Sequence, residues 1–309
     1  MRCRNVNVRQ GLSIFGAAGA STAFTDLFYR QADVGCLKPA TELQNPMAMS
    51  QQEETAVETR RRTASEIFEA ATESARSELK RSSSSLGISG FAAGITLGLT
   101  GLGVASIRGM LGSGPWQQFV ASLLYPVGFI TVIIGRQQLF TENTLYPVVL
   151  SLDEPGHWLN SLRLWVIVFC ANIAGAIVFA GLASHTTALG PRITSQLIEM
   201  GGEAATGTFA HIFWSGVVGG WVIALVAWVV SASHWTIGQV AVIWLLTFII
   251  GAGHFAHCVA SSCEILTAML AGSVPAFTYL HWLAAATVGN IAGGVVIVSV
   301  LNYAQVRQE

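Results

Sequence analysis

Six long apolar stretches, separated by polar segments, run from residue 84 to residue 303. Each is close to or longer than the ~20 residues that an α-helix needs to cross a bilayer. The pattern therefore predicts six membrane-spanning helices in two groups of three. Their expected ranges are 84–107, 119–150, 162–184, 212–230, 239–270 and 279–303.

The second and fifth stretches are too long, and too polar in their middles, to be single continuous helices. Polar residues interrupt the second stretch at 135–144 and the fifth at 251–264. Non-helical backbone and charged side chains are tolerated at membrane depth only where they face protein or a water-filled cavity. Both interruptions are therefore predicted to be helix breaks that line a path through the protein.

One spacing of 118 residues relates the two halves of the chain. The segment 172–176, Asn-Ile-Ala-Gly-Ala, recurs as 290–294, Asn-Ile-Ala-Gly-Gly, and the same offset carries the first interruption onto the second. Duplicated bundles with a broken helix in each half place their solute site near the bilayer midplane. The expected fold is an all-α membrane protein with six spans, arranged as two inverted three-helix repeats with broken second and fifth helices.

Composition agrees with a membrane protein. Hydrophobic residues make up 52% of the chain and charged residues 11%. From residue 82 to the end there are five Arg, no Lys and seven Asp or Glu, too few to solubilise a globular surface of that size. The net charge of −1 argues against nucleic acid as a partner. The expected surroundings are a lipid bilayer.

The segments before the first span are expected to carry no chemistry. Residues 1–62 are interpreted as a disordered tail or as sequence from an upstream start codon, with Met47 or Met49 as a natural start; a signal peptide is the alternative. Residues 63–81 are predicted to form an amphipathic cytoplasmic helix, and residues 82–305 the channel domain. Basic residues cluster before the first span, which places both termini in the cytoplasm of a cell-membrane protein.

Each predicted break supplies one polar residue suited to contact a solute. Thr141 in the first break has a hydroxyl group, and free backbone N–H groups are expected beside it. His257 in the second break can offer a hydrogen bond or a proton, because modest changes of environment move a histidine pKa across neutral pH. We therefore interpret Thr141 and His257 as the solute-contacting residues.

The other polar residues of the breaks are interpreted as structural. Arg136 and Glu142 are expected to form a buried ion pair that holds the first loop. His254 aligns with Arg136 at the 118-residue offset and is interpreted as a loop-holding or vestibule residue. Glu264 is interpreted as a structural acceptor at the start of the following half-helix.

Asn172 and Asn290 are also interpreted as structural. Each is followed by small residues that allow a neighbouring helix to approach closely. Their amides are expected to hydrogen-bond the loose backbone of the neighbouring break.

A metal site is conceivable but not favoured. His254, His257, Cys258, Cys263 and Glu264 are close in the sequence, yet no second ligand cluster accompanies them. No cofactor is indicated.

Three motifs together resemble the formate/nitrite transporter family, in a divergent branch. They are Leu139-Phe140-Thr141 in the second span, Phe255-Ala256-His257-Cys258-Val259-Ala260-Ser261 in the fifth, and Gly289-Asn290-Ile291-Ala292-Gly293-Gly294 in the sixth. The resemblance covers residues 65–305, in order and with fitting spacing.

The resemblance implies an aquaporin-like protomer that assembles as a homopentamer with one pore per protomer. Such pores carry formate, nitrite, hydrosulfide or similar small monovalent anions, often with a proton. His257 would then be the central pore histidine and Thr141 its partner across the pore. Hydrophobic constrictions would come from Phe129, Leu139 and Phe255, and Phe140 belongs to the same pore motif.

Two departures from the family pattern concern charge. The family commonly has Glu before the pore histidine, where this chain has Ala256. It also commonly has a Lys in the outer vestibule, whereas the last lysine of this chain is Lys80. These losses should weaken the attraction of dilute anions.

The leading hypothesis is a channel for a small monovalent anion or its weak acid, possibly proton-coupled. Two alternatives stay open at this point: a channel for a small neutral solute, and a non-transporting sensor or assembly protein with the same fold. An enzyme is not expected, because no nucleophile–base set emerges from the sequence.

Overall fold

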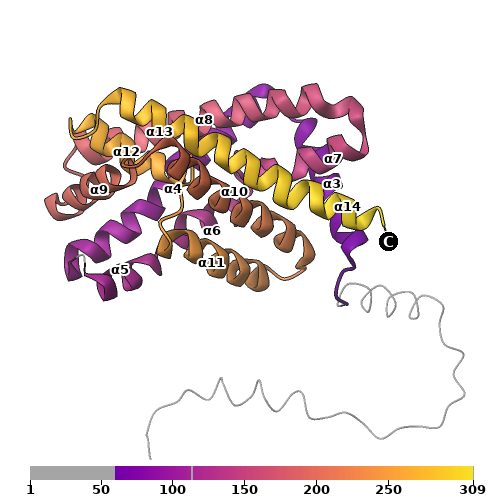
Figure 1. Ribbon diagram of the computed structural model, residues 1–309, viewed down its shortest axis with the longest axis horizontal. Helices are drawn as coiled ribbons and strands as arrows, with labels where there is room; N and C mark the ends of the chain where they lie inside the picture. The colour runs from indigo at the N-terminus through magenta and orange to yellow at the C-terminus, as the bar shows by residue number, and fades with distance from the viewer. Residues whose placement is uncertain (1–59, 113, 309) are drawn as a thin grey trace, which may run out of the picture. The chain divides into compact units, whose positions relative to one another are not determined.

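The computed structural model describes residues 60–112 and 114–308, and every regular element in these residues is a helix (Figure 1). The all-helical class predicted from the sequence is therefore confirmed for this part of the chain. The interpretation of the N-terminal tail falls almost entirely outside the described residues.

The helices follow one another closely along the chain. They are α3 (Ala64–Leu79), α4 (Ser83–Leu111), α5 (Pro115–Ser122), α6 (Pro126–Ile134), η1 (Glu142–Thr144), α7 (Tyr146–Asp153), η2 (Pro155–His157), α8 (Trp158–His185), α9 (Pro191–Ala204), α10 (Phe209–Ala232), α11 (Thr236–Ala252), α12 (Ala260–Leu270), α13 (Ala276–Ala292), the π-helical η3 (Gly293–Val300) and α14 (Leu301–Val306).

Five helical stretches among the described residues are long and apolar enough to cross a membrane: Ser83–Leu111, Pro115–Ile134, Pro155–His185, Phe209–Ala232 and Ala276–Val306. Two shorter apolar helices, α11 and α12, occupy the region that the sequence predicted as one interrupted span. Helix is lost between α6 and η1 and between α11 and α12, where the two polar interruptions fall.

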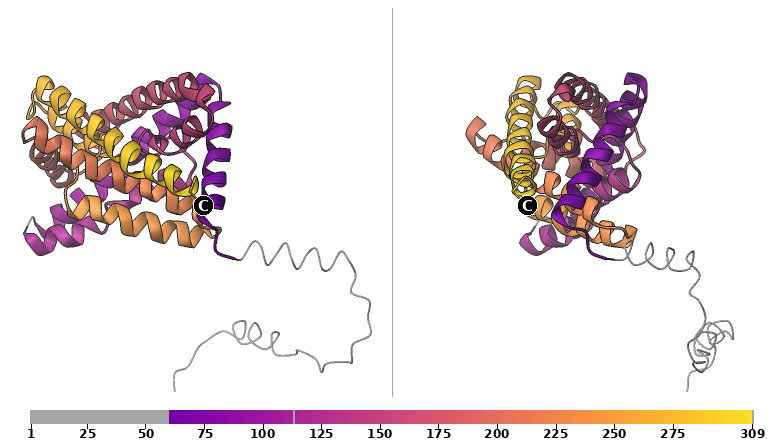
Figure 2. Two further views of the ribbon diagram at one scale, coloured as in Figure 1. Left: turned by 45° about the vertical axis from the view of Figure 1, so that its right-hand side comes forward. Right: turned by 90° about the vertical axis from the view of Figure 1, so that its right-hand side faces the viewer.

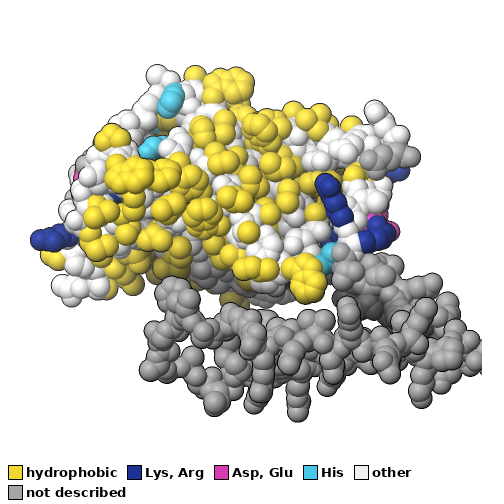
Figure 3. Space-filling view, turned by 90° about the horizontal axis from the view of Figure 1, so that it is seen from below, with side chains coloured by type: hydrophobic (Ala, Val, Ile, Leu, Met, Phe, Trp, Pro, Cys, Tyr) yellow, Lys and Arg dark blue, Asp and Glu magenta, His cyan; other side chains and the backbone are white. Residues whose placement is uncertain are grey.

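The surface of the bundle suits lipid. Large apolar side chains are exposed along most helices, including Ile88, Trp116, Leu159, Ile237 and Phe277. Figure 3 shows a face covered largely by hydrophobic side chains, with Lys and Arg only toward its ends. An apolar surface of this extent on a water-soluble monomer would be exceptional, whereas in a bilayer it is required.

Glycines let the long helices pack at backbone contact. A Cβ atom on Gly94 of α4 would lie 2.1 Å from the carbonyl oxygen of Asn172 on α8. A Cβ atom on Gly220 of α10 would lie 2.1 Å from the carbonyl oxygen of Asn290 on α13. Small residues at such crossings replace side-chain packing by close backbone approach, the usual mode of association between membrane helices. The close approach brings the two asparagines into reach of the breaks.

Asn172 fixes the backbone of the first break. Its side-chain oxygen accepts the N–H of Phe140 at 2.9 Å. Its amide nitrogen donates to the carbonyls of Gly90 on α4, at 2.8 Å, and Gln138, at 2.9 Å. One buried amide therefore satisfies two backbone groups of the break and adds a hydrogen bond to a carbonyl of α4.

Asn290 does the same for the second break. Its side-chain oxygen accepts the N–H of Cys258 at 2.8 Å. Its amide nitrogen donates to the carbonyls of Gly216 on α10, at 2.7 Å, and Ala256, at 2.9 Å. The structural role expected for both asparagines is thus seen as a matching set of hydrogen bonds, and the bonded break residues differ by the same 118 residues as the asparagines themselves.

The two breaks also share a backbone turn. Arg136 and His254 are the non-glycine residues with positive φ in the described chain, at 55° and 51°. Non-glycine residues rarely adopt this left-handed conformation, and its recurrence at the same offset shows that the two breaks have the same local geometry.

Helix α3 packs under the bundle at the end that also holds α14, away from α5 and α9 (Figures 1 and 2). It starts with a capping box between Thr63 and Glu66 and buries Ala71, Ala75 and Leu79. Arg76 donates to Glu154 at 2.6 Å, and this bond lowers the pKa of the Glu154 carboxyl. The amphipathic pattern of 63–81 thus corresponds to a helix docked on protein.

We expect Gly94→Ala to destabilise the protein by about 1–3 kcal/mol, the range for overpacking a close contact. The added methyl group would separate α4 from α8. Gly181→Ala on α8 is the matched control, because nothing lies within 4 Å of a Cβ atom there. Thermal denaturation in detergent, followed by size-exclusion chromatography, measures both; equal midpoints for the two variants would contradict this packing.

We expect Asn172→Ala and Asn290→Ala each to lower stability by roughly 3 kcal/mol or more, because two buried backbone groups of the break lose their partner and a third hydrogen bond, to a helix carbonyl, is also lost. Asn302→Ala serves as the control, since its side chain bonds only to Val298 of its own helical stretch at 2.8 Å. The same thermal assay reports the effect. A loss of stability no larger than that of Asn302→Ala would show that these amides do not hold the breaks.

Candidate functional site

The two helix breaks meet at one buried hydrogen bond. Thr141 Oγ1 of the first break lies 2.7 Å from His257 Nε2 of the second. Both side chains are fully buried. The residues singled out from the sequence, 116 positions apart, are therefore direct neighbours in space.

The hydrogen bonds of His257 assign its tautomer. Its Nδ1 accepts the backbone N–H of Ala260 at 3.0 Å, so this nitrogen carries no proton. In a neutral imidazole the other nitrogen is then the N–H donor. The network thus places the ring proton on Nε2, where it donates to the hydroxyl oxygen of Thr141.

His257 also lies at the N-terminus of α12. Its carbonyl accepts the N–H of Ser261 at 3.1 Å while its ring accepts that of Ala260, so the residue caps the first turn of the helix. The N-terminus of a helix carries partial positive charge and favours an anion. The pair therefore combines hydrogen-bonding side chains with the positive end of an 11-residue helix.

An aromatic side chain packs against the Thr141–His257 pair. The ring of Phe129 on α6 meets the imidazole edge-on, with centroids 5.0 Å apart. Leu139 is buried two residues before Thr141. The sequence-predicted residues Thr141, His257 and Phe129 thus lie together.

Two other predicted pore residues lie elsewhere. The ring of Phe140 packs on Trp165 and Phe169 of α8, with centroids 5.8 and 5.0 Å apart. Phe255 lines a separate cavity that neither Thr141 nor His257 lines. The backbone of Phe140, rather than its ring, ties it to the break through Asn172.

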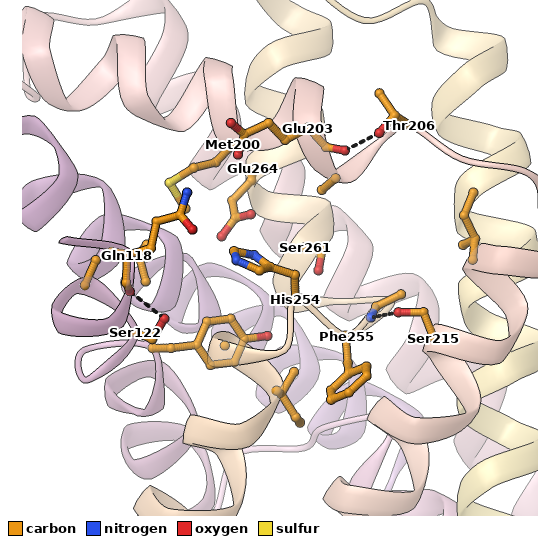
Figure 4. Close-up of a pocket in the computed structure, with 18 of the residues that line it drawn as sticks. Gln118, Ser122, Met200, Glu203, Thr206, Ser215, His254, Phe255, Ser261 and Glu264 are labelled. Carbon is orange, nitrogen blue, oxygen red and sulfur yellow. Dashed lines mark hydrogen bonds between the residues drawn. The ribbon is translucent and has the colours of Figure 1, made fainter. Parts of the chain in front are cut away.

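That cavity, which we call the vestibule cavity, has a volume of about 350 Å³ and lies among α4, α5, α9, α10, α11 and α12 (Figure 4). His254, Phe255, Ser261 and Glu264 line it from the second break and α12. Gln118 and Ser122 line it from α5. Because Ala256 and Ser261 also belong to the lining, the cavity ends within a few residues of His257.

One arginine and two glutamates give the vestibule cavity its charge. Arg108 of α4 is only 4% exposed and donates to both carboxylate oxygens of Glu203 on α9, at 3.0 and 3.2 Å. It lies 3.5 Å from Glu199 as well. Glu264 is 8% exposed, and its carboxylate has neither a hydrogen bond nor an ion pair within the described residues.

The structure corrects two expectations about charged residues. Glu264 does not act as a structural acceptor, because no donor among the described residues reaches it. Arg136 and Glu142 do not form a buried ion pair: Arg136 is exposed, and the ion pairs of the described chain do not join these two side chains. The left-handed turn at Arg136 directs the chain so that Asn172 and Gln138, rather than an ion pair, hold the loop.

Sequence reasoning did not find Arg108, Glu203 or Tyr125 as cavity residues. Arg108 follows the first apolar stretch as a single charge, and Glu203 lies in a polar segment without a recognised motif. Among the described residues, no group of three or more His, Cys, Asp or Glu could hold a metal ion. His254 and His257 point to different places, since only His254 lines the vestibule cavity.

Fold and site define a multi-pass helical membrane protein with a buried polar pair between two helix breaks. The model of the formate/nitrite transporter family matches residues 65–304, and the chain belongs to this family of membrane transporters and channels. The resemblance inferred from three short motifs is confirmed.

The chain is also similar in sequence to individual proteins. The chain is 31% identical over 235 residues to the inner membrane protein YfdC of Escherichia coli, covering 75% of each chain. It is 28% identical over 203 residues to a probable formate transporter of Methanothermobacter thermautotrophicus, covering 60% of this chain and 74% of the relative.

Solved structures show the same fold. An FNT family ion channel superimposes with a TM-score of 0.70 at 20% identity, over 78% of this chain and 98% of that one. A pentameric formate channel with formate bound superimposes with a TM-score of 0.63 at 20% identity, over 74% and 98%.

Proposed function

We propose that this protein is a channel for a small monovalent anion or its weak acid, of the formate, nitrite or hydrosulfide class. The observation that carries the proposal is the buried Thr141–His257 hydrogen bond between the two breaks. Formate is named for the Methanothermobacter relative and for one solved pentameric channel, which supports this substrate class.

The pair recognises the solute by hydrogen bonds. A small oxyacid that separates Thr141 from His257 accepts the Nε2–H and exchanges a hydrogen bond with the hydroxyl, so neither side chain loses its partner. Phe129 and Leu139 exclude the hydration shell, and dehydrating a full charge there is costly. The solute therefore crosses in near-neutral form, with a proton accompanying an anion.

We propose that the helices form six spans as two inverted three-helix repeats, in an aquaporin-like protomer that assembles as a homopentamer. The matching hydrogen bonds of Asn172 and Asn290, and the left-handed turns at Arg136 and His254, support the duplication. The exposed apolar surface supports contact with lipid and with further protomers.

Orientation follows from the basic residues. Five Arg and one Lys lie on or beside α3: Arg60, Arg61, Arg62, Arg76, Lys80 and Arg81. Of the Arg and Lys residues that the structure describes, Arg108 and Arg192 lie near the opposite end of the bundle, and Arg108 lines the vestibule cavity. By the positive-inside rule, α3 and both termini are cytoplasmic in a cell-membrane protein, and the vestibule cavity faces outward.

A channel for a small neutral solute is the second candidate. The favouring observation is that Arg108 is already neutralised by Glu203, so the vestibule cavity offers no spare positive charge to attract an anion. A neutral solute would use the same hydrogen bonds at Thr141 and His257.

We expect Thr141→Val to lower solute flux by roughly tenfold, about the value of one hydrogen bond in the pore, and His257→Ala to lower it at least as much and to change its pH dependence. Flux of formate, nitrite and hydrosulfide into liposomes containing the purified protein, at two pH values, measures this. Wild-type flux should rise as pH falls, because more solute is then in its acid form.

Thr247→Val is the matched control, since this buried threonine bonds only to Ile243 of its own helix at 2.7 Å. It should transport like the wild type. Wild-type flux and pH dependence in His257→Ala would remove this residue from the mechanism. No wild-type flux of any of the three solutes would overturn the proposed substrate class.

A further inference from the structure

The carboxylate of Glu264 is buried without a hydrogen bond or an ion pair among the described residues. Glu264 follows Ala260, the first residue of α12, by four residues, or about 6 Å along the helix axis, and its carboxylate lines the vestibule cavity (Figure 4). A Cβ atom on Gly101 of α4 would lie 2.9 Å from both Cγ and Oε1 of Glu264. The fold therefore leaves space on α4 that this carboxylate fills.

Arg108, the arginine of the vestibule cavity, is paired with glutamates other than Glu264. Both terminal nitrogens of Arg108 bond to Glu203, and one also reaches Glu199. With one arginine against two lining glutamates, an ionised Glu264 has no dedicated counter-charge. Burying an uncompensated charge is strongly unfavourable, and binding a proton removes that cost.

A second polar group of the vestibule cavity also lacks a partner. Tyr125 is 8% exposed and lines the same cavity, and its hydroxyl oxygen is buried without a hydrogen bond in the described chain. The Nε of Arg108 is likewise buried without a partner. Water or a polar solute in the cavity can supply the hydrogen bonds that these buried groups lack within the protein.

Several of the elements around the cavity place other charged or titratable groups near Glu264. They are Arg108 on α4, Tyr125 before α6, Glu199 and Glu203 on α9, His211 on α10, His254 in the second break and Cys263 on α12. His254 is exposed, so solvent screens its charge. The carboxylate of Glu203 raises the cost of a negative charge on Glu264, and the paired Arg108 lowers it only partly.

We propose that Glu264 is the proton-binding group of the vestibule cavity and passes its proton there to the anion of a weak acid. This inference rests on the proposed function and adds to it the place where proton and anion meet. The carboxylate takes a proton from a hydronium ion in the cavity, leaving a water molecule there. It then gives that proton to the anion, which leaves as the neutral acid toward Thr141 and His257 while the carboxylate is restored; no other reactant takes part.

The first test observes the proton directly. Infrared difference spectra of the reconstituted protein between mildly acidic and mildly alkaline pH should contain the C=O stretch of a carboxylic acid that is absent in Glu264→Gln. Glu199→Gln, at the same end of the bundle but outside the cavity lining, should retain that band. Glu264→Asp should retain it at a shifted frequency, which separates loss of the carboxyl from misfolding. A band unchanged in Glu264→Gln overturns the proposal.

The second test couples the proton to transport. Formate added outside liposomes that contain a pH-sensitive dye should acidify the interior, and Glu264→Gln should lower the rate by at least about tenfold, whereas Glu199→Gln should not. Wild-type acidification in Glu264→Gln also overturns the proposal. The Glu264-dependent infrared band without any wild-type transport of formate, nitrite or hydrosulfide would instead support the proton site and refute the proposed channel function.

Discussion

The structure depends on two asparagine side chains that replace helical hydrogen bonds where membrane helices are broken. A break inside the membrane exposes backbone N–H and C=O groups that lipid cannot satisfy. Asn172 and Asn290 each satisfy two of them from a neighbouring helix, and they reach them because glycines allow backbone contact at the same crossings. The breaks are thereby fixed, and the side chains they carry can meet at one point.

That arrangement explains the division of roles around the site. His257 is held by the first turn of α12, so it presents Nε2–H to Thr141 in a fixed orientation. The vestibule cavity ends nearby with a different chemistry, in which Arg108 is neutralised and Glu264 is left without a partner. We propose that charge is neutralised in the vestibule cavity and that the buried pair binds the solute by hydrogen bonds, so that no full charge enters the apolar constriction.

Much of the fold, and part of the candidate site, could be predicted from the sequence. The lengths of the apolar stretches predicted the positions of the membrane helices. The 118-residue offset predicted that Asn172 corresponds to Asn290 and that the first break corresponds to the second. The contact between Thr141 and His257 was accessible only through resemblance to a family. The sequence could not show that Arg136 stays exposed, that the ring of Phe140 turns to α8, or that Glu264 lacks a donor, because these depend on side-chain directions set by the left-handed turns and by α9.

We propose that the solute binds between Thr141 and His257, and the rest of the proposed transport path depends on this contact. Solid-state NMR of the reconstituted protein, with ¹⁵N-labelled histidine and ¹³C-labelled formate, tests it most directly through the dipolar coupling between formate carbon and His257 Nε2. If formate binds there, the distance between the formate carbon and His257 Nε2 should be within roughly 4 Å, as expected when a formate oxygen accepts the Nε2–H. The coupling should be lost in His257→Ala. Bound formate that shows no coupling to His257 would contradict it.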